Sequence, residues 1–285
     1  MEHRLPYSPS VRRRRLSAEL RRLRESCGMT AAQAAGRAGW PQSKVTKIEL
    51  GERKNVTVQD LAVLCEVYGV HDPKVREALE KLARDAKQRG WWSKYKDVFT
   101  DLLPDFETEA RIIRTYECQV VPGLLQLPEY IEAVFRGGQV HEPDVIERAV
   151  AARLRRQEIL NRFDPPELWA VLDEAALRRR IGGPEVMRKQ LQHLIHMAAR
   201  HNITIQVVPF GAGEHAALVG SFVILDFPAA LDPSLAYAET YTASLMMETT
   251  AELTRYNAVF GHLQGSALSA AESVKLLETV MSQLE

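Results

Sequence analysis

Apolar residues recur at helical spacing through the first ninety positions of the chain. Leu16, Leu20 and Leu23 share one face of a predicted helix, and arginines occupy its other faces. Thr30 and Gln33 have the spacing of a capping box, which marks the start of a second helix. In all, the pattern predicts short helices that begin near Leu16, Ala31, Gln42, Thr57 and Asp72. Residues 1–90 are therefore expected to form an all-α domain of five helices.

The pattern changes past residue 97 to a mixture of helical stripes and short runs rich in β-branched residues. The runs bounded by glycine or proline are typical of strands, and they cover 168–172, 203–208, 221–225 and 235–240. The predicted helices include 106–118, 143–163 and 184–200, and two that capping boxes open at Thr249 and Ser269. We expect an α+β domain with a small sheet and flanking helices over residues 97–285, after a linker at about 88–96.

The second and third predicted helices form a compact pair. Ala35 is small where the two helices cross, and Gly39 lies in the turn, where a positive φ is needed. Val45 and Ile48 form the apolar seam of the third helix. The seam leaves polar side chains on the opposite side of that helix: Gln42, Ser43, Thr46 and Lys47. Polar side chains near the start of an exposed helix are what base reading in a DNA major groove requires.

Charge is divided unequally along the chain. The 285 residues carry 37 basic and 37 acidic side chains, so the net charge is zero. Residues 1–54 hold 13 basic against 5 acidic side chains, a net charge of +8, and the remainder carries −8. This division is expected when one part of a protein contacts a polyanion. The run 12–15 of four arginines fits either an arm that reaches phosphates or the solvated start of the first helix.

Other protein classes are disfavoured by composition. No uninterrupted apolar run approaches the roughly 18 residues that a transmembrane helix needs, and residues 1–15 lack the apolar core of a signal peptide. The three cysteines are widely spaced, which fits reduced thiols and not a disulfide framework or a zinc site. We expect a cytoplasmic, nucleoid-associated protein without a cofactor.

Residues 16–70 resemble the helix-turn-helix modules of the lambda repressor and Cro (XRE) family. The resemblance rests on Gly28-x-Thr30, Ala35, Gly39, the Val45 and Ile48 seam, and Glu49-x-Gly51. It implies binding to double-stranded DNA and an ion pair between Arg24 and Glu49. Ala31 and Pro41 depart from the family, which has a polar phosphate-contacting residue and a Ser or Thr cap at these positions. Phosphate contact is therefore expected from Arg37, Lys44, Arg53 and Lys54.

Residues 97–280 resemble the effector domain that follows an XRE module in many actinobacterial regulators. The segments that carry this resemblance include VPGLLQLPEYIEAVF, LDEAALRRRIGGPEVMRKQLQHL and ITIQVVPF. The group includes developmental regulators of the WhiJ type and antitoxin-like regulators, which are often encoded beside a small partner protein. The resemblance implies a transcriptional regulator whose second domain binds a small partner protein or a ligand.

Two other functions remain as alternatives. Asp173, Glu174 and Glu239 lie near strand ends, where a carboxylate cluster would suit a metal-dependent hydrolase acting on DNA. Glu174 fits better as an acidic residue in the first turn of a helix. The helical module would also suit a protein-interaction adaptor. We expect a homodimer, because one such module reads only about half of a palindromic site. We do not expect an enzyme.

Overall fold

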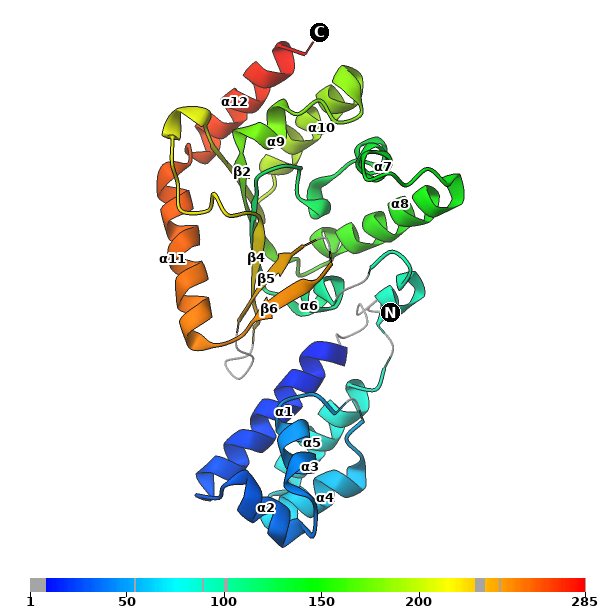
Figure 1. Cartoon of the computed structure of the whole chain (residues 1–285), viewed down its shortest axis with the longest axis vertical. Coiled ribbons are helices and arrows are strands. Elements are labelled where there is room, and N and C mark those ends of the chain that lie inside the picture. Colours follow the sequence, from blue (N-terminus) through cyan, green and yellow to red (C-terminus); the bar gives the residue numbers. More distant parts are fainter. Residues whose placement is uncertain are drawn as a thin grey trace. The chain divides into compact units, whose positions relative to one another are not determined.

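The computed structural model describes residues 9–53, 55–88, 90–99, 102–228, 234–240 and 242–284. The chain forms two compact units, and the boundary between them falls after Lys94. The first unit is all-α and the second is α+β (Figure 1). Both fold classes are as the sequence predicts.

Five α-helices make up the described part of the first unit. They are α1 (Pro9–Ser26), α2 (Ala31–Ala38), α3 (Gln42–Glu49), α4 (Val58–Val67) and α5 (Pro73–Asp85). Capping boxes open α2 at Thr30 and α4 at Thr57, and the Asp72 carboxylate caps α5, so the predicted starts of these helices are confirmed. Because α1 begins at Pro9, the arginine run 12–15 is helical. Helix α5 ends at Asp85, before the linker that the sequence predicts at about 88–96.

The core of the first unit is formed by apolar side chains from all five helices. It includes Leu16, Leu20, Ala34, Ala35, Val45, Ile48, Leu61, Leu64 and Leu79, each at most 2% exposed. Small alanines on α2 meet the Val45 and Ile48 seam of α3, which lets the two short helices pack closely.

The described residues of the second unit contain a six-stranded sheet. Its strands are β1 (Ile112–Glu117), β2 (Glu167–Asp173), β3 (Ile203–Val208), β4 (Phe222–Asp226), β5 (Leu235–Glu239) and β6 (Ser244–Met247). They lie in the order β3-β2-β1-β4-β5-β6. Strands β1, β2 and β3 are parallel, whereas β4, β5 and β6 add to β1 in antiparallel fashion. The sheet is therefore mixed, and β1 lies at its centre.

The central strand corrects a prediction from the sequence. The segment 106–118 was expected to be one helix, but it contains the end of α6 (Leu103–Glu109) and the whole of β1. Ile113 and Tyr116 are three positions apart, which imitates helical spacing. In the strand they lie on opposite faces, because side chains alternate along a strand. Strand β6 was not predicted either.

Helices cover both faces of the sheet. They are α7 (Pro128–Gly137), α8 (Pro143–Gln157), α9 (Glu174–Arg178), α10 (Gly183–Ala198), α11 (Thr250–Ser266) and α12 (Ala270–Ser282). Figure 1 shows α11 on one side of the strands and α7 and α8 on the other. On the α11 side, Phe260 and Leu263 pack with Tyr116, Phe222 and Ile224 of the sheet. The capping boxes predicted at Thr249 and Ser269 are both present.

Candidate nucleic-acid interface

A tight turn joins α2 to α3. Gly39 ends α2 with φ +66°, a left-handed conformation that glycine adopts without strain. The Trp40 amide then donates to the Ala35 carbonyl at 2.9 Å. Pro41 precedes α3 and offers no side-chain cap, but its carbonyl accepts a hydrogen bond from the Lys44 amide at 2.9 Å. The turn and the buried seam together fix α3 against α2.

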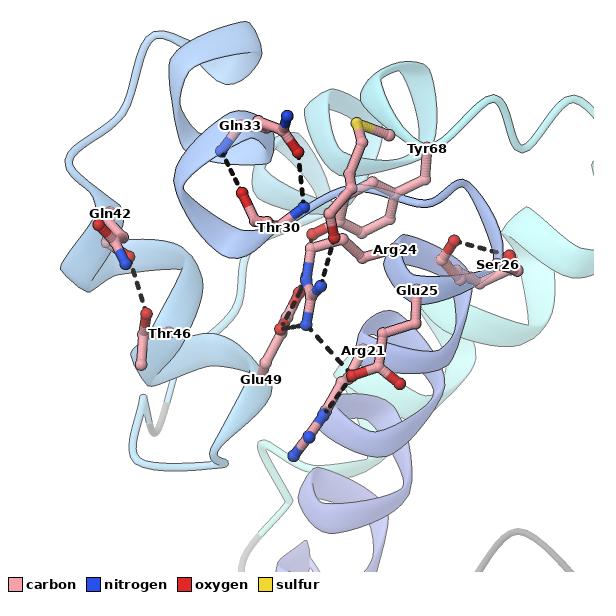
Figure 2. Close-up of polar contacts among 12 residues, drawn as sticks. Arg21, Arg24, Glu25, Ser26, Thr30, Gln33, Gln42, Thr46, Glu49 and Tyr68 are labelled. Atoms are coloured by element: carbon pink, nitrogen blue, oxygen red, sulfur yellow. Dashed lines mark hydrogen bonds and ion pairs between the residues drawn. The ribbon is translucent and has the colours of Figure 1, made fainter.

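The outer face of α3 presents most of the predicted base-reading residues. Gln42, Ser43 and Lys47 are exposed, and Arg37 is exposed on α2. Thr46 is partly buried, and its hydroxyl donates to the Gln42 carbonyl at 3.1 Å (Figure 2). Gln42, Ser43 and Lys47 are therefore the members of this set whose side chains are open to solvent.

Lys44 and Arg53 have an acidic neighbour. The Lys44 ammonium lies 2.6 Å from an Asp60 oxygen and 3.4 Å from the centroid of the Trp40 ring, and Arg53 lies 3.8 Å from the other Asp60 oxygen. Burial of Asp60 opposes its ionisation, but hydrogen bonds from Lys44 and Thr57 outweigh burial and hold the carboxyl pKa below its usual value. The positive charge of this pair is thus partly balanced within the fold. Lys54 lies outside the described residues.

A buried ion pair joins α1 to the end of α3. The Arg24 guanidinium donates to the Glu49 carboxylate at 2.8 and 2.9 Å, and also to the Met29 carbonyl at 2.6 Å (Figure 2). Both side chains are at least nine-tenths buried. Hydrogen bonding to Glu49 raises the Arg24 pKa, so the guanidinium stays charged. These are the two residues that the sequence resemblance pairs.

Tyr68 is a third member of this cluster that sequence reasoning missed. Its hydroxyl donates to Glu49 at 3.0 Å (Figure 2). Burial, and then the adjacent Glu49 charge, raise the Tyr68 pKa, so the phenol keeps its proton. Tyr68 follows α4 and continues the apolar spacing of Leu61, Leu64 and Cys65, a pattern that predicts only a core side chain.

A second contact from α1 holds the same end of α3. The Ser17 hydroxyl donates to the Ile48 carbonyl at 2.6 Å, and both groups are buried. Gly51 follows with φ +72°, and a side chain there would meet Ser17 at 3.6 Å. The C-terminal end of α3 is therefore fixed to α1 at two points, whereas the outer side of its N-terminal turn faces solvent.

The carboxylates considered for metal chemistry have structural partners. Asp173 accepts a hydrogen bond from the Ala175 amide at the start of α9, at 2.8 Å. Glu174 accepts from Arg178 at 2.6 Å and from the Phe210 amide at 2.7 Å. Within the part of the chain that the structure describes, no group of three or more His, Cys, Asp or Glu side chains is arranged to hold a metal ion.

The class of protein follows from this geometry. A family model for a helix-turn-helix domain matches residues 15–79, which span α2, the turn and α3 together with the buried pair. The first unit is therefore a helix-turn-helix domain, the kind of domain that DNA-binding regulators carry.

The second unit defines the family. The model of a domain of unknown function (DUF5753) matches residues 100–279, more than half of the chain, and the chain belongs to this family. No curated protein and no solved structure matches the chain. Among the described helices, none combines the length and apolar character needed to cross a membrane.

Proposed function

We propose that the protein is a sequence-specific transcriptional regulator of the XRE type that binds DNA as a homodimer. The observation that carries the proposal is the exposed polar side of α3, with Gln42, Ser43 and Lys47, on a helix whose other end is fixed by buried contacts to α1. A helix held in this way can enter a major groove without losing its orientation.

The charge distribution supports DNA as the partner. The net charge of +8 lies within residues 1–54, which contain both helices of the motif. Arg37 is exposed beside α3, where it would contact the phosphate backbone, while the side chains of α3 read base edges. A dimer follows because a module of this size reads about half of a palindrome.

The proposal is tested by measuring binding to the DNA upstream of the protein's own gene across a salt series. Affinity should fall steeply with salt, and Arg37→Ala should reduce the slope by about one unit. Gln42→Ala should weaken specific binding by about 1–3 kcal/mol if Gln42 reads a base. Gln88→Ala is the matched control, since Gln88 is exposed beyond the end of α5. A flat salt response, or equal losses for both glutamine variants, would contradict DNA reading by α3.

We further propose that the second unit receives a signal, from a small partner protein or a ligand, and has no catalytic activity. The structural partners of Asp173 and Glu174 support this role. Incubation of operator DNA with the protein and Mg²⁺ or Mn²⁺ should leave the DNA intact. Cleavage that Asp173→Ala abolishes would favour the hydrolase instead.

A further inference from the structure

A cavity of about 200 Å³ lies within the second unit, on the side of the sheet that does not pack against α11. Its floor is formed by side chains of β1, β4 and β5, namely Ile113, Thr115, Glu117, Val223 and Tyr237. Its walls come from α6, α8 and the segment 120–126. A cavity of about 150 Å³ is large enough for benzene, so this one has room for a ligand of roughly six to ten heavy atoms.

One ion pair in the cavity wall is complete. Glu107 of α6 accepts two hydrogen bonds from Arg156 of α8, at 2.5 and 2.7 Å, and its side chain is 1% exposed. Gly123 leaves room for this arginine, since a side chain there would meet the Arg156 guanidinium at 3.3 Å. These two charges neutralise each other inside the protein.

Two further charged groups line the same cavity without such a partner. Glu117 ends β1 and accepts a hydrogen bond from the Thr115 hydroxyl at 3.5 Å. Arg153 of α8 donates to the Gln126 side chain at 2.5 Å and lies over the Phe135 ring, 4.8 Å from its centroid. Among the described residues, neither Glu117 nor Arg153 has an oppositely charged atom within 4.0 Å. The cavity therefore offers a carboxyl and a guanidinium that are not in contact with each other, and Glu239 of β5 also lines it.

The pKa of each of these two groups is shifted toward its uncharged form. Burial raises the Glu117 pKa to about 7, against hydrogen bonding from Ser221 and the attraction of Arg156. Burial, followed by repulsion from Arg156, lowers the Arg153 pKa to about 10, against the attraction of Glu239 and Glu117. A buried charge is stabilised when a counter-charge with hydrogen-bonding geometry reaches it. A ligand that brings one charge of each sign would stabilise both groups at once.

We propose that this cavity binds a zwitterionic small molecule of amino-acid size, with its carboxylate on Arg153 and its ammonium on Glu117. Arg153 offers a planar set of donors that suits a carboxylate, and Glu117 and the neighbouring Ser221 offer acceptors to an ammonium. Leu103, Ile113 and Val223 in the lining would contact the ligand's aliphatic part. The inference deepens the proposed function, since the ligand would be the signal that the second unit receives.

The test is calorimetric titration of the full-length protein, without DNA, with each of the standard amino acids at millimolar concentration. At least one should bind, and analogues that lack either its amino or its carboxylate group should bind more than about tenfold more weakly. Glu117→Gln and Arg153→Met should each weaken binding by a similar factor. Arg155→Met and Glu167→Gln are the matched controls: Arg155 pairs with Glu158, Glu167 is exposed, and neither lines the cavity.

Several results would overturn this assignment: no heat with any amino acid, full affinity for the amine or acid analogue, or equal affinity for the variants and the wild type. Glu117→Gln keeps the side-chain shape, and circular dichroism of each variant separates a folding defect from lost binding. Operator affinity is measured separately in the absence of amino acids. Failure to bind an amino acid therefore leaves the test of DNA binding intact, and the reverse also holds.

Discussion

Arg24 holds a charge in the interior of the first unit, and this charge is balanced by Glu49. Arg24→Met keeps the aliphatic stem but leaves the buried Glu49 carboxylate without its guanidinium. We expect this substitution to cost about 3 kcal/mol of stability, because an uncompensated buried charge is expensive. Thermal unfolding of the full-length chain measures the effect.

The control for Arg24→Met is a pair of the same residue types at the surface. Arg21 contacts Glu25 at 2.8 Å, but both side chains are more than half exposed. Arg21→Met should leave the melting temperature almost unchanged, since solvent screens such pairs. Equal melting temperatures for the two variants would show that the buried pair does not stabilise the domain.

The raised pKa of Glu117 makes the stability of the folded protein depend on pH. Its pKa rises from an ordinary 4.5 to about 7 in the folded protein, mainly through burial. The folded state therefore holds this proton more tightly than the unfolded state. The stabilisation is complete below about pH 4.5 and is lost as pH rises through 7.

Glu117→Gln should remove that dependence, which amounts to at most about 3 kcal/mol between pH 4.5 and 7. Urea unfolding at several pH values, for the wild type and the variant, isolates this contribution from those of other groups. Glu167→Gln, an exposed change at the start of β2, should follow the wild type. A wild type and a Glu117 variant with parallel pH profiles would contradict the assignment.

Some contacts of single residues can be predicted from the sequence, and others cannot. Arg24 and Glu49 could be paired in advance, because a known motif places them in register. Tyr68 could not, because an aromatic residue on an apolar stripe gives no sign of where its hydroxyl points. Arg153 and Glu117 are 36 positions apart in a helix and a strand, and only the packing of α8 over the sheet brings them to one cavity.

At the level of elements, the turn between α2 and α3 depends on one backbone conformation. Gly39 has φ +66°, and a side chain added there would meet nothing within 4 Å. Gly39→Ala should therefore cost about 1–2 kcal/mol through conformation alone, and Gly39→Asn should cost less, because asparagine tolerates this region. Urea unfolding of the full-length chain measures both variants.

Gly36 supplies a control of opposite sign. It lies within α2, is exposed and also has open space around it. Gly36→Ala should increase stability by up to about 1 kcal/mol, because alanine favours the helix. Destabilisation by both alanine variants would mean that steric contacts, and not the backbone conformation of the turn, determine the outcome.

Elements with local signals were predicted correctly, and the central strand was not. Capping residues at Thr30, Thr57, Thr249 and Ser269 act within one turn of chain, so the sequence alone locates those helix starts. Strand β1 is defined by neighbours on both sides, with Thr115 opposite Ala170 of β2 and Val223 of β4. Its own pattern has helical spacing, and only pairing with distant strands makes it extended.

For the whole molecule, the first unit has a core of its own and should fold without the second. A protein of residues 1–94 should be helical by circular dichroism and monomeric by analytical ultracentrifugation. It should bind a palindromic operator more weakly than the full chain if the second unit supplies dimer contacts. Equal affinities would place the dimer contacts in the first unit.

The central position of β1 also sets an order of events during synthesis. Arg114 of β1 bonds to Asp226 of β4 across 112 positions, whereas the Arg24–Glu49 and Tyr68–Glu49 contacts of the first unit span 25 and 19 positions. A sheet cannot close around its middle strand until the last of that strand's neighbours has left the ribosome. The helix-turn-helix domain is therefore expected to be complete while most of the second domain is still being made, so that nascent chains already carry a folded helix-turn-helix.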